Sequence, residues 1–95
     1  TVAEEQASPI ATEAELSDRV ADLVEYLVLS IVDDEDAVSL EVIDGADASV
    51  IEITVADADV AKVIGRHRRT IKAIRTLARA LAARLGTSVE VEVLG

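Results

Sequence analysis

Apolar residues in the first third of the chain recur at intervals of three and four, the period of a helix with one buried face. Thr12 followed by Glu15 has the spacing of a capping box, which predicts that the helix begins there. Its predicted apolar face consists of Leu16, Val20, Leu23, Leu27 and Ile31, with Val24 and Val28 beside it. The acidic run at residues 33–36 is predicted to end the helix, because anions are unfavourable at its negative end.

The pattern then changes to alternation of apolar and polar positions, which is typical of half-buried strands. Strands are predicted at residues 38–42, 51–55 and 89–93. The first two flank the turn residues 44–47 and form a hairpin. Asp57 or Asp59 is predicted to cap a short helix that runs through Ile64 and ends at Gly65. A longer helix at residues 69–85 should end at Gly86, with an apolar face of Ile71, Ile74, Ala78, Leu81 and Leu85.

The element order is therefore helix, strand, strand, helix, helix, strand, which predicts an α+β fold. The chain has 95 residues, enough for one domain. Residues 1–11 show no apolar periodicity and are predicted to be a flexible acidic tail, and residues 12–95 a single domain. No cysteine is present, which excludes a disulfide framework, a thiol nucleophile and a cysteine-based zinc site. No apolar run is long enough for a membrane span and the N-terminal residues do not resemble a signal peptide, so a cytoplasmic location is expected.

Charge is distributed unevenly along the chain. The formal net charge is −10, yet residues 60–89 contain no Asp or Glu. This segment holds eight of the nine cations: Lys62, Arg66, Arg68, Arg69, Lys72, Arg75, Arg79 and Arg84. Because ionic interactions are screened over ~8 Å in physiological salt, the local patch matters more than the total charge. The segment is a candidate site for a polyanion, which the acidic remainder would repel elsewhere.

The junction of the two predicted helices concentrates this chemistry. A loop between them places backbone N–H groups at a helix N-terminus, where anions bind readily. Gly65 would let a sugar-phosphate backbone approach closely. Helical spacing puts Arg68, Lys72, Arg75 and Arg79 on one stripe. The predicted contacts for single-stranded RNA are Ile64, Gly65, Arg66, His67, Arg68, Arg69, Thr70, Ile71, Lys72, Arg75 and Arg79. In this prediction the cationic side chains bind phosphates, and the aliphatic side chains pack against the faces of the bases.

The run Val-Ile-Gly-Arg-His-Arg-Arg-Thr-Ile-Lys at residues 63–72 resembles the small bacterial KH proteins of the KhpA type. The resemblance covers roughly residues 16–94. It implies a type II KH fold, with a three-stranded sheet and helices packed on one face. It also implies RNA binding through a GXXG loop, here Gly65, Arg66, His67 and Arg68. A role as RNA chaperone or post-transcriptional regulator follows from the resemblance, as do self-association and pairing with a second KH protein of the Jag (KhpB) type.

Arg68 departs from the family pattern, which usually has a second glycine at that position. The arginine side chain could block close approach of RNA, or it could contact a phosphate directly. A dimerisation module with weakened RNA binding is therefore an alternative function. A helix-turn-helix DNA reader is disfavoured by the surrounding strands.

The remaining polar groups predict no catalytic or metal site. His67 has no candidate partner close in sequence and is read as an exposed loop residue. The acidic run at residues 33–36 is read as a solvated linker, and Glu90 and Glu92 as the wet side of a strand. Tyr26, the single aromatic residue, is predicted to lie in the core with its hydroxyl near the surface. The chain is thus expected to be no enzyme and to need no cofactor.

Overall fold

The computed structural model describes residues 12–95, so the predicted tail at residues 1–11 lies outside the described part. Helix α2 (Glu13–Leu29) begins where the sequence predicts. The Thr12 hydroxyl accepts a hydrogen bond from the Glu15 N–H at 3.2 Å, and the Glu15 carboxylate accepts one from the Thr12 N–H at 3.4 Å. The predicted capping box is confirmed.

The buried face of α2 is centred differently from the prediction. Val20, Val24 and Val28 are fully buried, whereas Leu16, Leu23 and Leu27 are half-buried at its flank. The prediction for Tyr26 was wrong, because its side chain is 69% exposed on the outer side of α2. Short β-branched side chains fill the space under the helix, and the larger residues lie beside them.

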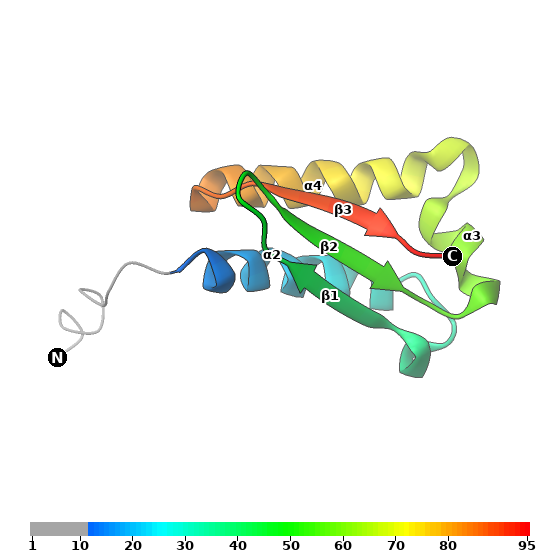
Figure 1. Ribbon diagram of the computed structural model, residues 1–95. Coiled ribbons are helices and arrows are strands. Elements are labelled where there is room, and N and C mark those ends of the chain that lie inside the picture. Colours follow the sequence, from blue (N-terminus) through cyan, green and yellow to red (C-terminus); the bar gives the residue numbers. More distant parts are fainter. Residues whose placement is uncertain (1–11) are drawn as a thin grey trace, which may run out of the picture.

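In the described part of the chain, three strands form one mixed sheet in the order β1-β2-β3. Strand β1 (Ser39–Ile43) pairs antiparallel with β2 (Ser49–Thr54), and β2 pairs parallel with β3 (Val89–Val93). Two helices, α3 (Asp57–Ile64) and α4 (Arg69–Leu85), connect β2 to β3. A parallel pair requires such a crossover. The predicted order of elements is confirmed (Figure 1).

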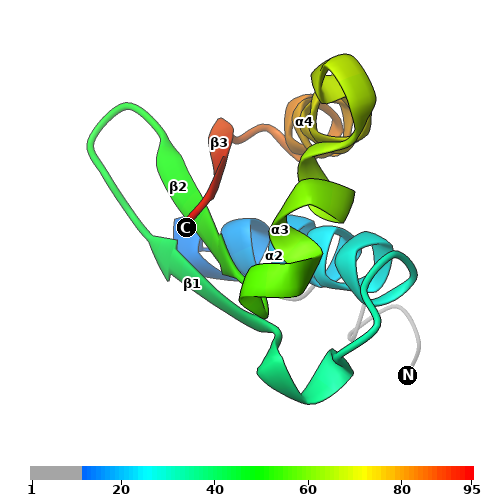
Figure 2. The same ribbon diagram turned by 90° about the vertical axis from the view of Figure 1, so that its right-hand side faces the viewer.

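Helices α2, α3 and α4 pack on one face of the sheet, as expected (Figure 2). Ile51, Ile53 and Val91 point into the core between the sheet and the helices and are at most 3% exposed. The opposite face is acidic, because the register aligns Glu41, Glu52 and Glu92 in one row across the three strands. The alternation that predicted the strands therefore separates a core face from a charged face.

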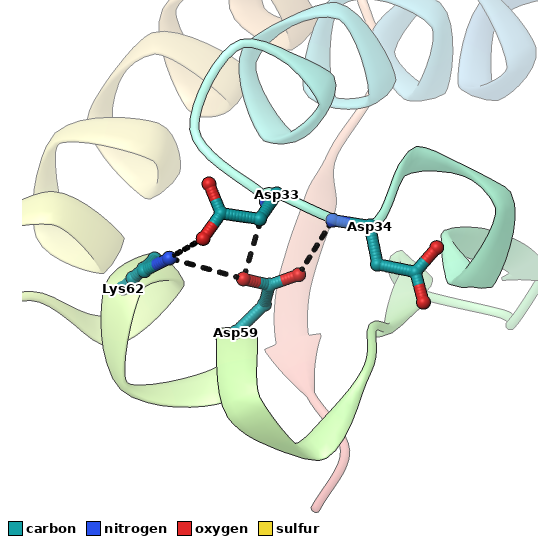
Figure 3. Close-up of polar contacts among 4 residues, drawn as sticks. All are labelled: Asp33, Asp34, Asp59 and Lys62. Atoms are coloured by element: carbon teal, nitrogen blue, oxygen red, sulfur yellow. Dashed lines mark hydrogen bonds and ion pairs between the residues drawn. The ribbon is translucent and has the colours of Figure 1, made fainter.

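Helix α3 begins without a side-chain cap, and its N-cap is Ala56. The prediction that Asp57 or Asp59 caps it was wrong. The Asp59 carboxylate instead accepts hydrogen bonds from the backbone N–H groups of Asp33 (3.2 Å) and Asp34 (3.0 Å) (Figure 3). The segment at residues 33–36 is thus tied to α3 through its backbone, although its side chains are exposed. The prediction that residues 33–36 form a solvated linker is therefore confirmed for the side chains and wrong for the backbone.

Lys62 completes this contact from the next turn of α3. Its ammonium group forms an ion pair with Asp33 and lies 3.5 Å from Asp59 (Figure 3). The hydrogen bonds from Asp34 and Asp33 lower the pKa of Asp59, with a smaller contribution from Lys62 that acts in the same direction. The hydrogen bond to Asp33 raises the pKa of Lys62. The α2–β1 connection is therefore held against α3 by one ionised, 2% exposed carboxylate.

Candidate nucleic-acid interface

Gly65 ends α3 in a conformation that a side chain would not fit. Its φ is +78°, a backbone conformation that residues other than glycine rarely adopt. A Cβ at this position would lie 2.2 Å from Thr70 Oγ1 and 2.9 Å from the Thr70 nitrogen. The first turn of α4 therefore packs directly against the Gly65 backbone, with the half-buried Thr70 filling the space where a side chain would be.

Between Gly65 and α4 the chain makes one tight turn, η2 (Arg66–Arg68). The Arg68 N–H donates to the Gly65 carbonyl at 3.0 Å and closes the turn. His67 (φ 55°) and Arg68 (φ 60°) are both left-handed, and they are the two residues other than glycine with positive φ among residues 12–95. Each such residue costs about 1 kcal/mol or more. The fold holds this loop in place against a local backbone preference.

The loop presents a group of cations to solvent. Arg66, Arg68, Arg69 and Lys72 are exposed and have no ion-pair partner among residues 12–95. We call these four residues the loop cations. No side chain caps α4, and the Arg69 N–H at its start donates to the Arg66 carbonyl within the loop. A long helix carries partial positive charge at that end, which adds to the field of the side chains.

The rest of the predicted stripe turns toward β3. Arg75 Nε donates to the Val91 carbonyl at 3.1 Å, and Arg79 Nη2 donates to Glu90 Oε1 at 2.8 Å. These contacts place the basic side of α4 beside β3, and the two elements lie next to each other (Figures 1 and 2). The stripe is therefore divided, because Arg68 and Lys72 at one end are without ion-pair partners among residues 12–95 and Arg75 and Arg79 at the other end are engaged by β3.

Within residues 12–95, strand β3 pairs with β2 alone, so its other edge lies on this side. The Ser88 carbonyl accepts from Ser49, and the Leu94 N–H donates to Ile53. Since alternate residues of a strand direct their backbone groups toward a given neighbour, Val91 directs its carbonyl away from β2. The Val91 carbonyl is the one that Arg75 engages. Sequence reasoning missed this edge and the contact to Glu90, because no local pattern reports contacts across 11 or 16 residues.

The two predicted aliphatic contacts occupy different environments. The Ile71 side chain is 1% exposed and belongs to the core, so it offers no surface to a base. Ile64 is half-buried and packs against the same core from the end of α3. The structure thus brings Gly65 to Thr70 and Lys72 together at one end of α4, and it directs Ile71 inward.

Two pockets among residues 12–95 lie away from the loop. A pocket of about 220 Å³ lies between the C-terminal half of α4 and β3, lined in part by Arg79, Ala83 and Glu90. A larger pocket of about 380 Å³ is lined by the β1–β2 turn, Glu13 and residues 86–88. It lies at the far end of α4, some 25 Å along the helix from the loop at ~1.5 Å per residue.

Neither a metal site nor a membrane span emerges in the described part of the chain. Residues 12–95 contain no group of three or more His, Asp or Glu side chains that could hold a metal ion. None of the described helices is long and apolar enough to cross a bilayer.

The chain matches known proteins over most of its length. The model of the KhpA/KhpB KH domain matches residues 21–93. "RNA-binding protein KhpA" of Borreliella burgdorferi is 45% identical over 73 residues, which cover 77% of this chain and 89% of that protein. The protein of the same name from Caldanaerobacter subterraneus is 39% identical over 75 residues, which cover 79% of this chain and all of that protein. These names are those of RNA-binding proteins and not of enzymes, in agreement with the prediction.

A solved structure shares the fold at lower sequence similarity. The crystal structure of Era in complex with MgGDPNP and nucleotides 1506–1542 of 16S ribosomal RNA aligns with a TM-score of 0.52 and 24% identity. The alignment covers 79% of this chain and 30% of Era, so the likeness concerns one part of that protein and its fold alone. Together with the element order, the glycine loop and the family match, these findings show that the chain belongs to the KhpA/KhpB family of KH-domain proteins.

Proposed function

We propose that this chain binds single-stranded RNA through a GXXG-like loop, residues 65–68, and the adjoining basic side of α4. The observation that carries the proposal is the group of four loop cations beside the uncapped N-terminus of α4. Phosphates would meet the loop cations at the positive end of the α4 dipole, and Gly65 allows α4 to pack closely against the loop that carries them. The names of the relatives, RNA-binding protein KhpA, point to the same ligand.

Bases would lie along the groove between α4 and β3. Without stacking aromatics, the groove would offer backbone groups on the outer edge of β3, where Arg75 already engages the Val91 carbonyl. A single strand has its bases free to use such an edge, whereas in an RNA duplex they are paired. Binding is therefore expected to tolerate different sequences and to favour single strands over duplexes.

A titration of the full chain with a short fluorescent single-stranded RNA at several salt concentrations tests this proposal. If all four loop cations contact phosphates, log K should fall with log[salt] with a slope of roughly −2 to −3, at about −0.7 per contact. Duplex DNA at the same salt concentration should bind more weakly. Absence of RNA binding at low salt, or a slope near zero, would rule the proposal out.

Arg68 decides between the proposed function and its alternative, a dimerisation module with weakened RNA binding. Its left-handed φ favours glycine at this position, and its side chain stands among the loop cations. We expect Arg68→Gly to lower RNA affinity roughly three- to tenfold through loss of one phosphate contact, with stability changed by less than about 1 kcal/mol. A large gain in affinity would instead favour the alternative. Fluorescence anisotropy and thermal melting measure the two effects.

Membership of the family supports a wider proposal. We propose a type II KH protein that acts in the cytoplasm as an RNA chaperone or post-transcriptional regulator. Self-association and pairing with a second KH protein of the Jag (KhpB) type belong to the same proposal.

A further inference from the structure

The ion pair of Arg79 with Glu90 lies on the proposed path of the RNA. Arg79 belongs to the same side of α4 as Lys72 and Arg75, two turns beyond Lys72. Its guanidinium donates to the Glu90 carboxylate between α4 and β3, and both residues line the 220 Å³ pocket. An RNA strand that follows α4 from the loop would meet this pair after the loop cations.

Carboxylate and phosphate compete for the same donor. A guanidinium binds either group through the same planar set of N–H donors. When Arg79 is paired with Glu90, it offers RNA fewer donors, and the Glu90 carboxylate stands where a phosphate would have to approach. Glu52 and Glu92 lie in the neighbouring row of the open sheet face and add to the negative field there.

The pair is exchangeable. The side chains of Arg79 and Glu90 are 58% and 55% exposed, and ion pairs in such positions contribute little to stability. Its removal should therefore leave the fold intact. Lys62 differs, because its pairing with Asp33 and Asp59 belongs to a junction that holds two segments together.

We infer that Glu90 is a built-in competitor for RNA phosphate, which holds Arg79 away from the RNA and keeps the affinity of the domain below what its basic side would allow. The inference rests on the proposed function and deepens it. It assigns Arg79 as a latent phosphate contact and Glu90 as the residue that limits binding at this end of the groove.

The test is the RNA affinity of Glu90→Gln in the full chain, measured with the same fluorescent single-stranded RNA. The amide cannot form the ion pair, so Arg79 is free to contact a phosphate. We expect affinity at low salt to rise roughly three- to tenfold. The slope of log K against log[salt] should steepen by about 0.7, the value for one added phosphate contact.

Two controls separate competition from a general change of charge. Glu92→Gln makes the same change two residues along β3, at a side chain with no ion-pair partner among residues 12–95. It should alter affinity less than twofold. The gain from Glu90→Gln should also disappear in an Arg79→Ala background, and unchanged melting curves should show that the fold is retained.

The outcomes distinguish this inference from the proposed function. If the wild-type chain binds RNA and Glu90→Gln binds no more tightly, the inference fails alone. Equal gains from Glu90→Gln and Glu92→Gln, or a gain that persists without Arg79, would likewise overturn it. Absence of RNA binding by every variant would refute the proposed function, and the inference with it.

Discussion

Reversing two of the loop cations together should abolish most RNA binding. Arg66 and Lys72 are exposed at the loop and on the first turn of α4, and neither has an ion-pair partner among residues 12–95. The double variant Arg66→Glu, Lys72→Glu removes two phosphate contacts and places two carboxylates beside the RNA backbone. At roughly tenfold or more per site, affinity at low salt should fall at least about 100-fold, as measured by fluorescence anisotropy.

The chain supplies a matched control for this variant. Arg19 on α2 and Arg84 in the last turn of α4 are also exposed and without ion-pair partners among the described residues. Arg19→Glu with Arg84→Glu changes the net charge by the same amount, away from the loop. It should weaken RNA binding less than about threefold. Equal losses in the two double variants would mean that total charge decides binding and that the loop does not.

Removal of the Asp59 carboxylate should strongly destabilise the fold. Asp59→Ala removes the acceptor of two part-buried hydrogen bonds, those from the backbone N–H groups of Asp33 and Asp34, and the loss of both is costly. The ion pair of Lys62 with Asp59 is lost as well. We expect the midpoint of thermal unfolding to fall by roughly 10 °C or more, measured by circular dichroism. Asp57→Ala, an exposed position in the same turn of α3, should shift it by a few degrees at most.

The same carboxylate gives stability a pH dependence of known sign. Its pKa in the folded state lies below its ordinary value of 3.8, mainly because of the hydrogen bonds from Asp34 and Asp33. The unfolded chain therefore takes up a proton first as the pH falls. This contribution is fully present above pH 3.8 and is lost as the pH falls through the folded-state pKa. The stability difference between wild type and Asp59→Asn should shrink in that range. A constant difference would contradict the assignment.

Local sequence patterns determined the elements of this fold. The capping box at Thr12, the alternation in the strands and the glycine that ends α4 each act within a few residues, so the sequence predicted the order of helices and strands. The asymmetric placement of cations likewise located the basic segment. It did so because a contiguous run without acidic residues keeps its charge in any fold.

What the sequence by itself could not determine is which of these residues face one another. Tyr26 was assigned to the core by its residue type, yet α2 packs through valines and leaves it exposed. Asp59 was predicted as a possible helix cap, whereas its carboxylate oxygens accept hydrogen bonds from the backbone of Asp33 and Asp34, which lie 26 and 25 residues away in the chain. Arg79 is paired with Glu90 because α4 packs against β3, whereas the loop cations lie at the other end of the helix and have no ion-pair partner among residues 12–95. Helical spacing fixes a stripe of charges, but the packing of distant strands decides which charges remain free.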